Sequence, residues 1–95
     1  MPTKAEKEHL SRVAEIGCIV CRNLGFEETP AQIHHIRSGV GMGQRASHFE
    51  VIPLCFVHHS AQSDYGYHHS PATWQQQHGS EKELLQQVME MVSND

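Results

Sequence analysis

Two short patterns in the chain have the spacing of metal ligands. Cys18 and Cys21 are separated by two residues, and so are Cys55 and His58. This spacing lets one tight turn direct both ligand atoms of a pair at a single tetrahedral ion. Two such turns that meet on one Zn²⁺ form a closed structural site, with Zn–S distances of roughly 2.3 Å and Zn–N distances of roughly 2.0 Å. The alternative is that the cysteines are reduced and packed in the core as small apolar side chains.

Histidine is unusually frequent, with nine residues in a chain of 95. Residues 33–59 contain five of them, and six of the nine form the adjacent pairs His34-His35, His58-His59 and His68-His69. Neutral imidazole is the commonest metal ligand and a general base near neutral pH. The enrichment therefore indicates metal chemistry or proton transfer. Zinc scavenging by a histidine-rich surface is an alternative that explains the pairs but not the spacing of the cysteines.

The net charge of −4 is distributed unevenly along the chain. Residues 31–80 are balanced, with Arg37 and Arg45 against Glu50 and Asp64. This middle part can therefore face phosphates, but it lacks the basic surface of a strong nonspecific DNA-binding protein. We expect a weak unaided affinity for DNA.

Length and hydropathy are typical of a small soluble domain. At 95 residues, apolar burial alone barely offsets chain entropy, so a bound metal or a partner subunit is expected. No apolar run is long enough to span a membrane, and the N-terminal segment MPTKAEKEHL is charged where a signal peptide is apolar. Three cysteines form no closed disulfide set, which suits a reducing cytosol. We expect a cytoplasmic protein without a membrane partner.

Local signals predict helices at both ends of the chain. Capping-box spacing at residues 3–6 predicts a first helix over about residues 4–16, ended by a glycine. A serine followed by proline predicts a helix over residues 71–78, with Trp74 in the core. A second capping box, at residues 80–83, opens a final helix with one apolar face.

The segment between these helices predicts two short strands and a helix. Alternating apolar residues favour a strand over residues 31–37, and a second strand over residues 49–52 is closed by Pro53. A helix from about residue 55 to residue 63 would carry His58 and His59. These elements must bring the histidine pairs together if they form one site.

The order strand, loop, strand and metal-binding helix is that of the ββα-metal (His-Me finger) nucleases, and residues 18–69 resemble the HNH endonuclease superfamily. The run Gly-Met-Gly-Gln-Arg-Ala-Ser-His-Phe, followed by Ile-Pro-Leu-Cys and His58-His59, is most similar to the phage recombination-enhancement (Ref-like, recombinase-dependent) nucleases and their prophage relatives. Residues 74–85 match the same group more weakly.

This resemblance implies the fold class and the domain organisation. The fold would be α+β, a small zinc-stabilised ββα-metal core with flanking N- and C-terminal helices. Residues 1–95 would form one HNH-like nuclease domain. Its parts would be an N-terminal helix (1–17), a zinc-knuckle and ββα core (18–69) and C-terminal helices (70–95).

The resemblance also implies an activity. The chain would be a metal-dependent DNA endonuclease of phage or prophage type, linked to recombination, that hydrolyses phosphodiester bonds to leave 5′-phosphate and 3′-hydroxyl ends. Its cofactors would be one structural Zn²⁺ and one divalent ion (Mg²⁺, Mn²⁺ or Zn²⁺) at the active site. Its partners would be DNA and a host recombinase filament, in the host cytoplasm. The alternative is a noncatalytic zinc-ribbon module that binds DNA or protein.

Carried over to this chain, the resemblance makes His34 and His59 ligands of the catalytic ion and His35 the general base. His68 would match a further family histidine that binds the metal ion or a phosphate, and we group it with the ligands. A divalent ion relieves charge on the phosphate and the leaving oxygen, while an imidazole takes a proton from water. Neighbouring side chains of a strand point to opposite faces. His34 and His35 are therefore expected to need a distorted strand end to take these different roles.

One position departs from the HNH pattern. The usual middle asparagine is replaced by Glu50, whereas His48 matches the Ref-like group. We expect His48 to take over the orienting or ligating role and group it with His35 as catalytic. The alternatives are a surface His48 and a Glu50 that is either a ligand or solvent-facing, the latter being favoured.

Three polar side chains are candidates for binding phosphate, namely Arg37, Gln44 and Arg45. The alternative is that these three side chains are simply solvated. His9 and His78 are expected to be ordinary surface residues.

Overall fold

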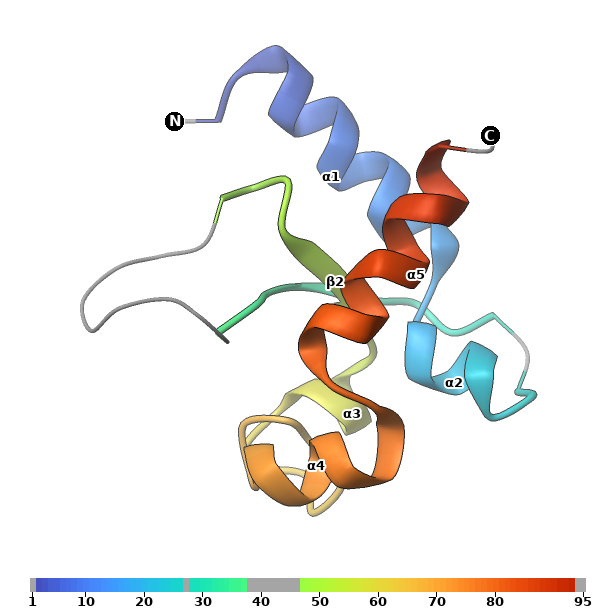
Figure 1. The fold of residues 1–95 in the computed structure, drawn as a ribbon, viewed down its shortest axis with the longest axis vertical. Coiled ribbons are helices and arrows are strands. Elements are labelled where there is room, and N and C mark those ends of the chain that lie inside the picture. Colours follow the sequence, from blue (N-terminus) through green and yellow to red (C-terminus); the bar gives the residue numbers. More distant parts are fainter. Residues whose placement is uncertain (1, 27, 38–46, 94–95) are drawn as a thin grey trace.

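The computed structural model describes residues 2–26, 28–37 and 47–93, which form five helices and a two-stranded sheet (Figure 1). The elements are, in order, α1 (Lys4–Ile16), α2 (Ile19–Asn23), β1 (Gln32–His35), β2 (Val51–Leu54), α3 (Phe56–His59), α4 (Pro71–His78) and α5 (Glu81–Ser93). The predicted α+β class is confirmed. Within the described ranges, no helix has the length and apolar character needed to cross a membrane.

The two long helices begin at the predicted capping boxes. The backbone N–H of Glu6 donates to Thr3 Oγ1 at 3.2 Å, and the Thr3 N–H donates back to Glu6 Oε1 at 2.8 Å. Ser80 and Glu83 exchange the same two bonds, both at 3.1 Å. These reciprocal bonds satisfy backbone donors that the first turn of a helix leaves unpaired. Both predicted helix starts are confirmed.

The sheet is an antiparallel pair in which β2 runs through Pro53, so the predicted end of this strand was wrong. The bond from Ile36 N to Glu50 O, at 3.2 Å, marks a hydrogen-bonded position. Bonded and non-bonded positions alternate, so the pair formed by Ile33 and Pro53 is non-bonded. The proline ring therefore costs the ladder no hydrogen bond.

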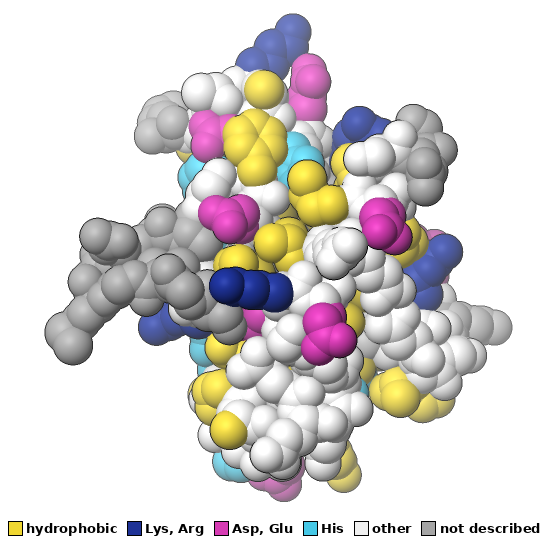
Figure 2. All heavy atoms as spheres, in the orientation of Figure 1, with side chains coloured by type: hydrophobic (Ala, Val, Ile, Leu, Met, Phe, Trp, Pro, Cys, Tyr) yellow, Lys and Arg dark blue, Asp and Glu magenta, His cyan; other side chains and the backbone are white. Residues whose placement is uncertain are grey.

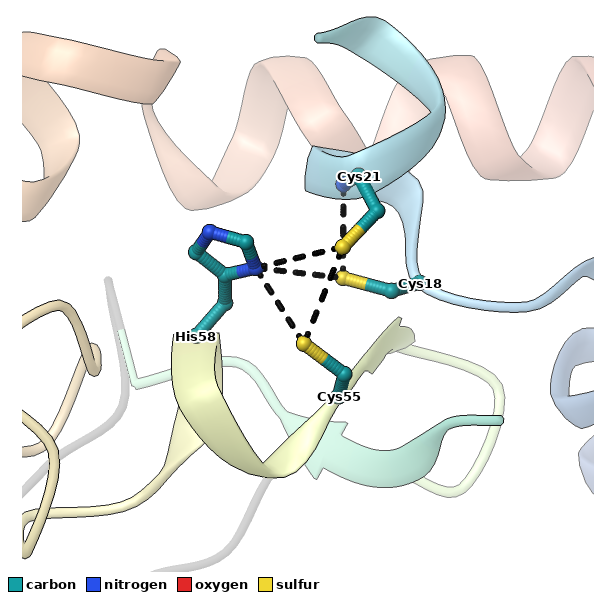
Figure 3. A group of neighbouring side chains, drawn as sticks. All are labelled: Cys18, Cys21, Cys55 and His58. Atoms are coloured by element: carbon teal, nitrogen blue, oxygen red, sulfur yellow. Dashed lines mark hydrogen bonds between the residues drawn. The ribbon is translucent and has the colours of Figure 1, made fainter. Parts of the chain in front are cut away.

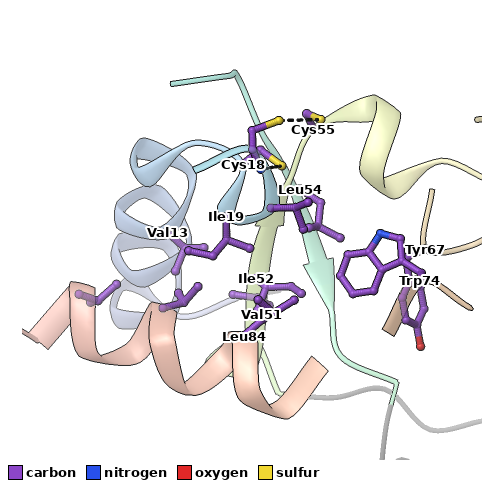
Figure 4. Packing of buried hydrophobic residues seen from close by; sticks show 14 residues of the cluster. Val13, Cys18, Ile19, Val51, Ile52, Leu54, Cys55, Tyr67, Trp74 and Leu84 are labelled. Carbon is purple, nitrogen blue, oxygen red and sulfur yellow. Dashed lines mark hydrogen bonds between the residues drawn. The ribbon is translucent and has the colours of Figure 1, made fainter. Parts of the chain in front are cut away.

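The core lies where the helices cover β2. All four residues of β2 are buried, and α1, α2 and α5 contact this strand. Figure 4 shows side chains from these elements converging, among them Val13, Ile19, Ile52 and Leu84. Full burial of one such aliphatic side chain contributes about 1.5–3 kcal/mol. Trp74 is buried as predicted.

α1 lies at one end of the molecule and α3 and α4 lie at the other, and α5 runs from the α4 end past β2 to α1 (Figure 1). α3 ends at His59, four residues earlier than its predicted end at residue 63. The chain then turns back, and the backbone N–H of Tyr67 donates to His58 O at 2.9 Å. A side chain at Gly66 would place its Cβ 1.9 Å from the carbonyl oxygen of Ser60, so this close approach requires glycine. The turn brings His68 back beside α3.

Gly66→Ala is expected to lower the free energy of unfolding by about 1–3 kcal/mol, because backbone must move to accommodate the methyl group. Urea unfolding monitored by circular dichroism measures this change. Gln62→Ala, in the same turn and exposed, is the control and should stay within about 0.5 kcal/mol of wild type. Equal stabilities of the two variants would contradict the close approach of residues 60 and 66.

Candidate functional site

The two knuckles of the sequence meet in a buried Cys₃His cluster. The ligand atoms of Cys18, Cys21, Cys55 and His58 all lie within 4.8 Å of one another. His58 Nδ1 lies 3.2, 3.5 and 3.7 Å from the sulfur atoms of Cys55, Cys21 and Cys18, respectively. Figure 3 shows the four side chains directed toward a common centre between α2 and α3. The cluster suggests a structural metal such as zinc.

The local structure explains how each pair reaches this centre. Cys18 is the N-cap of α2, and Cys55 is the N-cap of α3. The second ligand of each pair follows three positions later, on the same side of the first helical turn. Two helix starts therefore present two ligands each, as the spacing predicts.

The chemistry of the donors fits a metal ion. Burial raises the pKa of the Cys18 thiol to about 12, despite the opposing effect of the Cys21 and Cys55 backbone groups. Burial also lowers the pKa of His58, with a smaller contribution from His78. Thiolates in such a setting need a compensating cation. Three sulfurs and one imidazole are a ligand set typical of structural Zn²⁺.

A second cluster joins three histidines from different segments. The ligand atoms of His34, His59 and His68 lie within 4.8 Å of one another, with His34 buried, His59 half-buried and His68 exposed. Ring centroids are 5.2 Å apart for His34 and His59, and 4.9 Å apart for His59 and His68. Unlike the Cys₃His cluster, this group reaches solvent on one side. An open side is the arrangement that catalytic metal sites have.

The electrostatics of this cluster favour neutral rings at His59 and His68. Burial, together with the nearby His34 and His68, lowers the pKa of His59 to about 4. The pKa of His68 is also lowered, mainly by burial and then by His34 and Arg37, against the opposing carboxylate of Glu81. His59 and His68 are therefore neutral at pH 7, which is the form that binds metal ions.

Two polar side chains hold the rings of this cluster. Glu81 Oε2 lies 2.6 Å from His34 Nε2, and Gln32 Oε1 lies 2.8 Å from His59 Nδ1. Because carboxylate and amide oxygens accept, these ring nitrogens carry the protons. The basic nitrogens are then Nδ1 of His34 and Nε2 of His59.

His35 and His48 form a separate pair, with His35 Nε2 at 2.9 Å from His48 Nδ1. β1 is regular through both of its histidines, with His34 opposite Ile52 and His35 opposite Val51. The expected distortion of the strand end is absent from β1. The structure thus brings His34, His59 and His68 together and places His35 with His48, on the other face of the strand.

The sequence matches the model of a family described as recombination enhancement, RecA-dependent nuclease, over residues 2–93. The chain belongs to this family. The RecA-dependent nuclease family is, by its description, one of nucleases linked to recombination, and the predicted resemblance to recombinase-dependent nucleases is confirmed at this level. A search of curated proteins gave no match to the chain.

The remaining predicted site residues of this RecA-dependent nuclease family member differ in their surroundings. Arg37 has an exposed side chain, and its backbone N–H donates to Glu81 Oε2 at 2.8 Å. Glu50 is exposed, as favoured. Gln44 and Arg45 lie outside the described residues.

The prediction that His9 and His78 are surface residues was wrong. His9 is 8% exposed, and its ring lies 5.2 Å from that of Phe49, because α1 packs against the turn that precedes β2. His78 is half-buried between Trp74 and His58, with ring centroids 5.3 and 5.5 Å away. Both burials depend on contacts between segments far apart in the sequence.

Sequence reasoning missed Glu81 and Gln32, whose side chains hydrogen-bond to histidine rings of the open cluster. Glu81 is in the first turn of α5, where an acidic residue is ordinarily explained by the helix dipole. Gln32 is one polar residue in a strand. The sequence contains no local signal that distinguishes either from a solvated side chain.

Cys55→Ser is expected to lose the tightly retained metal ion and to unfold at a lower temperature, because a hydroxyl is a poor substitute for a thiolate ligand. Metal analysis after gel filtration and thermal unfolding measure both effects. The wild-type protein should retain one Zn²⁺ per chain, whereas zinc scavenging gives a variable count that a mild chelator removes. His69→Ala, exposed and outside both clusters, is the control. Full zinc retention by Cys55→Ser would contradict the assignment.

Proposed function

We propose that this chain is a metal-dependent DNA endonuclease of the HNH type, of phage or prophage origin, that acts in recombination. Residues 1–95 would form one nuclease domain with a ββα-metal core. The observation that carries the proposal is that one small fold holds two clusters of potential metal ligands. One cluster is closed and rich in sulfur, and the other is open and made of histidines.

The order of the elements supports a ββα-metal core. β1, β2 and α3 follow one another in the chain, and the two strands pair antiparallel. The open cluster takes His34 from the first strand and His59 from the helix. This is the arrangement that the resemblance to the HNH superfamily implies.

The open cluster fits a divalent ion held by His34, His59 and His68. Three imidazole ligands suit Zn²⁺ or another transition-metal ion better than Mg²⁺, which prefers oxygen ligands. An ion bound there would supply charge stabilisation for the phosphate and for the leaving oxygen. The exposed side at His68 leaves room for the substrate.

The opposite orientations of His34 and His35 suit an in-line displacement at phosphorus. In such a reaction the attacking water and the leaving oxygen lie on opposite sides of the phosphorus atom. A phosphate at the end of β1 would have the open cluster on its leaving-group side and His35 on its nucleophile side. Since β1 itself separates the two faces, the phosphate would have to lie beyond the last residue of the strand to contact both groups.

His48 would hold His35 in its basic form. If His35 Nε2–H donates to His48 Nδ1, the basic lone pair of His35 is on Nδ1 and takes the proton from water. As His35 becomes positively charged, His48 Nδ1 continues to accept the Nε2–H. This orienting role replaces the asparagine that is missing from the pattern.

The charges support a substrate presented by a partner. The net charge is −4, and on the face in Figure 2 the described Lys and Arg side chains are scattered among acidic ones. The Arg37 guanidinium lowers the pKa of His68 through its charge, and the same charge would attract a phosphate at the open cluster. Gln44 and Arg45 remain predicted phosphate ligands. A host recombinase filament on DNA would compensate for the weak unaided affinity.

His35→Ala is expected to lower the rate of nicking by about 10²–10⁴-fold, the usual contribution of a general base. The assay is nicking of supercoiled plasmid with Zn²⁺, Mn²⁺ or Mg²⁺, with and without a recombinase filament. His34→Ala should also abolish nicking, and His69→Ala should cut like wild type.

The same assay separates the enzyme from the noncatalytic zinc-ribbon module. A module would bind DNA or filament without nicking under any condition. Absence of nicking by folded, zinc-loaded wild-type protein with every ion and with the filament would overturn the proposed activity.

A further inference from the structure

Glu81 is a fully buried carboxylate at the start of α5, with a relative exposure of 0%. Such groups are rare in protein interiors and need hydrogen-bonding partners. Its carboxylate accepts from His34 Nε2 at 2.6 Å and from the backbone N–H of Arg37 at 2.8 Å through Oε2. The hydroxyl of Tyr67 donates to Oε1 at 3.0 Å.

These donors come from the segments that carry the open cluster. His34 is one of its three ligands, and Arg37 follows the end of the strand that holds it. Tyr67 precedes His68 directly, and the Tyr67 ring lies 4.6 Å from the His34 ring. The Glu81 carboxylate therefore binds His34 itself, the backbone just after β1, and Tyr67, which is next to His68.

The position of Glu81 is itself well fixed. Its backbone N–H donates to Gln75 Oε1 at 3.1 Å, which links the start of α5 to α4. Leu84 and Val88, further along α5, are buried in the core. The N-terminus of a helix also favours a negative charge. The helix thus holds the carboxylate rigidly against His34.

The contact with His34 determines which ring nitrogen carries the proton. A carboxylate that accepts Nε2–H leaves the lone pair on Nδ1, and it makes the ring more basic toward a metal ion. Burial and the Glu81 carboxylate also raise the pKa of Tyr67 to about 12, so its hydroxyl stays a donor.

We propose that Glu81 is a positioning residue that fixes the ring orientation and tautomer of His34 and so raises the affinity of the three-histidine cluster for a divalent ion. The inference rests on the proposed function, because it takes His34 as a ligand. It makes α5, outside the ββα core, a required part of the open site.

The test is a Co²⁺ titration without DNA, after the Cys₃His site has been filled with Zn²⁺. Visible absorption and calorimetry report ion binding at the histidine cluster. Glu81→Gln should weaken Co²⁺ binding by about 10- to 100-fold, as loss of an outer hydrogen-bonding partner of a ligand commonly does. Glu90→Gln, exposed on the same helix, should bind like wild type. Zinc content should stay unchanged in both variants.

Two further measurements test the positioning role if the Glu81→Gln variant does not fold. Tyr67→Phe keeps the carboxylate but removes one of its donors, and should weaken Co²⁺ binding less than Glu81→Gln does. Long-range ¹H–¹⁵N NMR of wild-type protein without Co²⁺ should show His34 as the Nε2–H tautomer. The Nδ1–H tautomer, or wild-type Co²⁺ affinity in folded Glu81→Gln, would overturn the positioning role.

The outcomes distinguish this inference from the proposed function. If His34→Ala abolishes Co²⁺ binding while Glu81→Gln leaves it unchanged, the cluster binds an ion and the positioning role of Glu81 is wrong. If zinc-loaded wild-type protein binds no Co²⁺ at the histidines, the ion site itself is wrong, and the inference falls with it.

Discussion

The Cys₃His cluster is the constraint on which the rest of the structure depends. It joins α2 to α3, and α3 carries His58 of the closed cluster next to His59 of the open one. Apparent zinc-binding free energies of about 10–16 kcal/mol in small zinc domains are as large as the whole net stability of a typical protein, about 5–15 kcal/mol. Fixing His58 on an ion therefore also fixes the direction of His59. The two clusters share the short helix α3. An ordered Cys₃His cluster therefore supports the geometry of the histidine cluster.

β1 imposes a second constraint, because it separates two groups of histidines. Its alternation sends His34 toward His59 and His68, and sends His35 toward His48. Because the strand itself separates its two faces, a phosphate that contacts both groups would have to lie beyond the end of β1. The surrounding helices then hold the strand, since α5 places Glu81 against His34 and α1 packs over the same sheet.

Local signals in the sequence predicted the parts of the fold that depend on near neighbours. Capping boxes located the starts of α1 and α5, and two-residue spacings identified the ligand pairs that the structure brings together. Features set by contacts between distant segments escaped prediction. They include the passage of β2 through Pro53, which depends on the pairing register, and the early end of α3, which depends on the approach of Gly66 to Ser60. The buried Glu81 belongs to the same group.

The central claim is that this fold binds metal ions at two separate sites. Its most direct test is anomalous diffraction at the zinc absorption edge from a crystal saturated with Zn²⁺. The predicted result is two separate peaks, one among Cys18, Cys21, Cys55 and His58, and one in contact with His34, His59 and His68. A single peak at the Cys₃His cluster, with the three histidines directed apart at saturating Zn²⁺, would contradict the second centre and with it the proposed nuclease site.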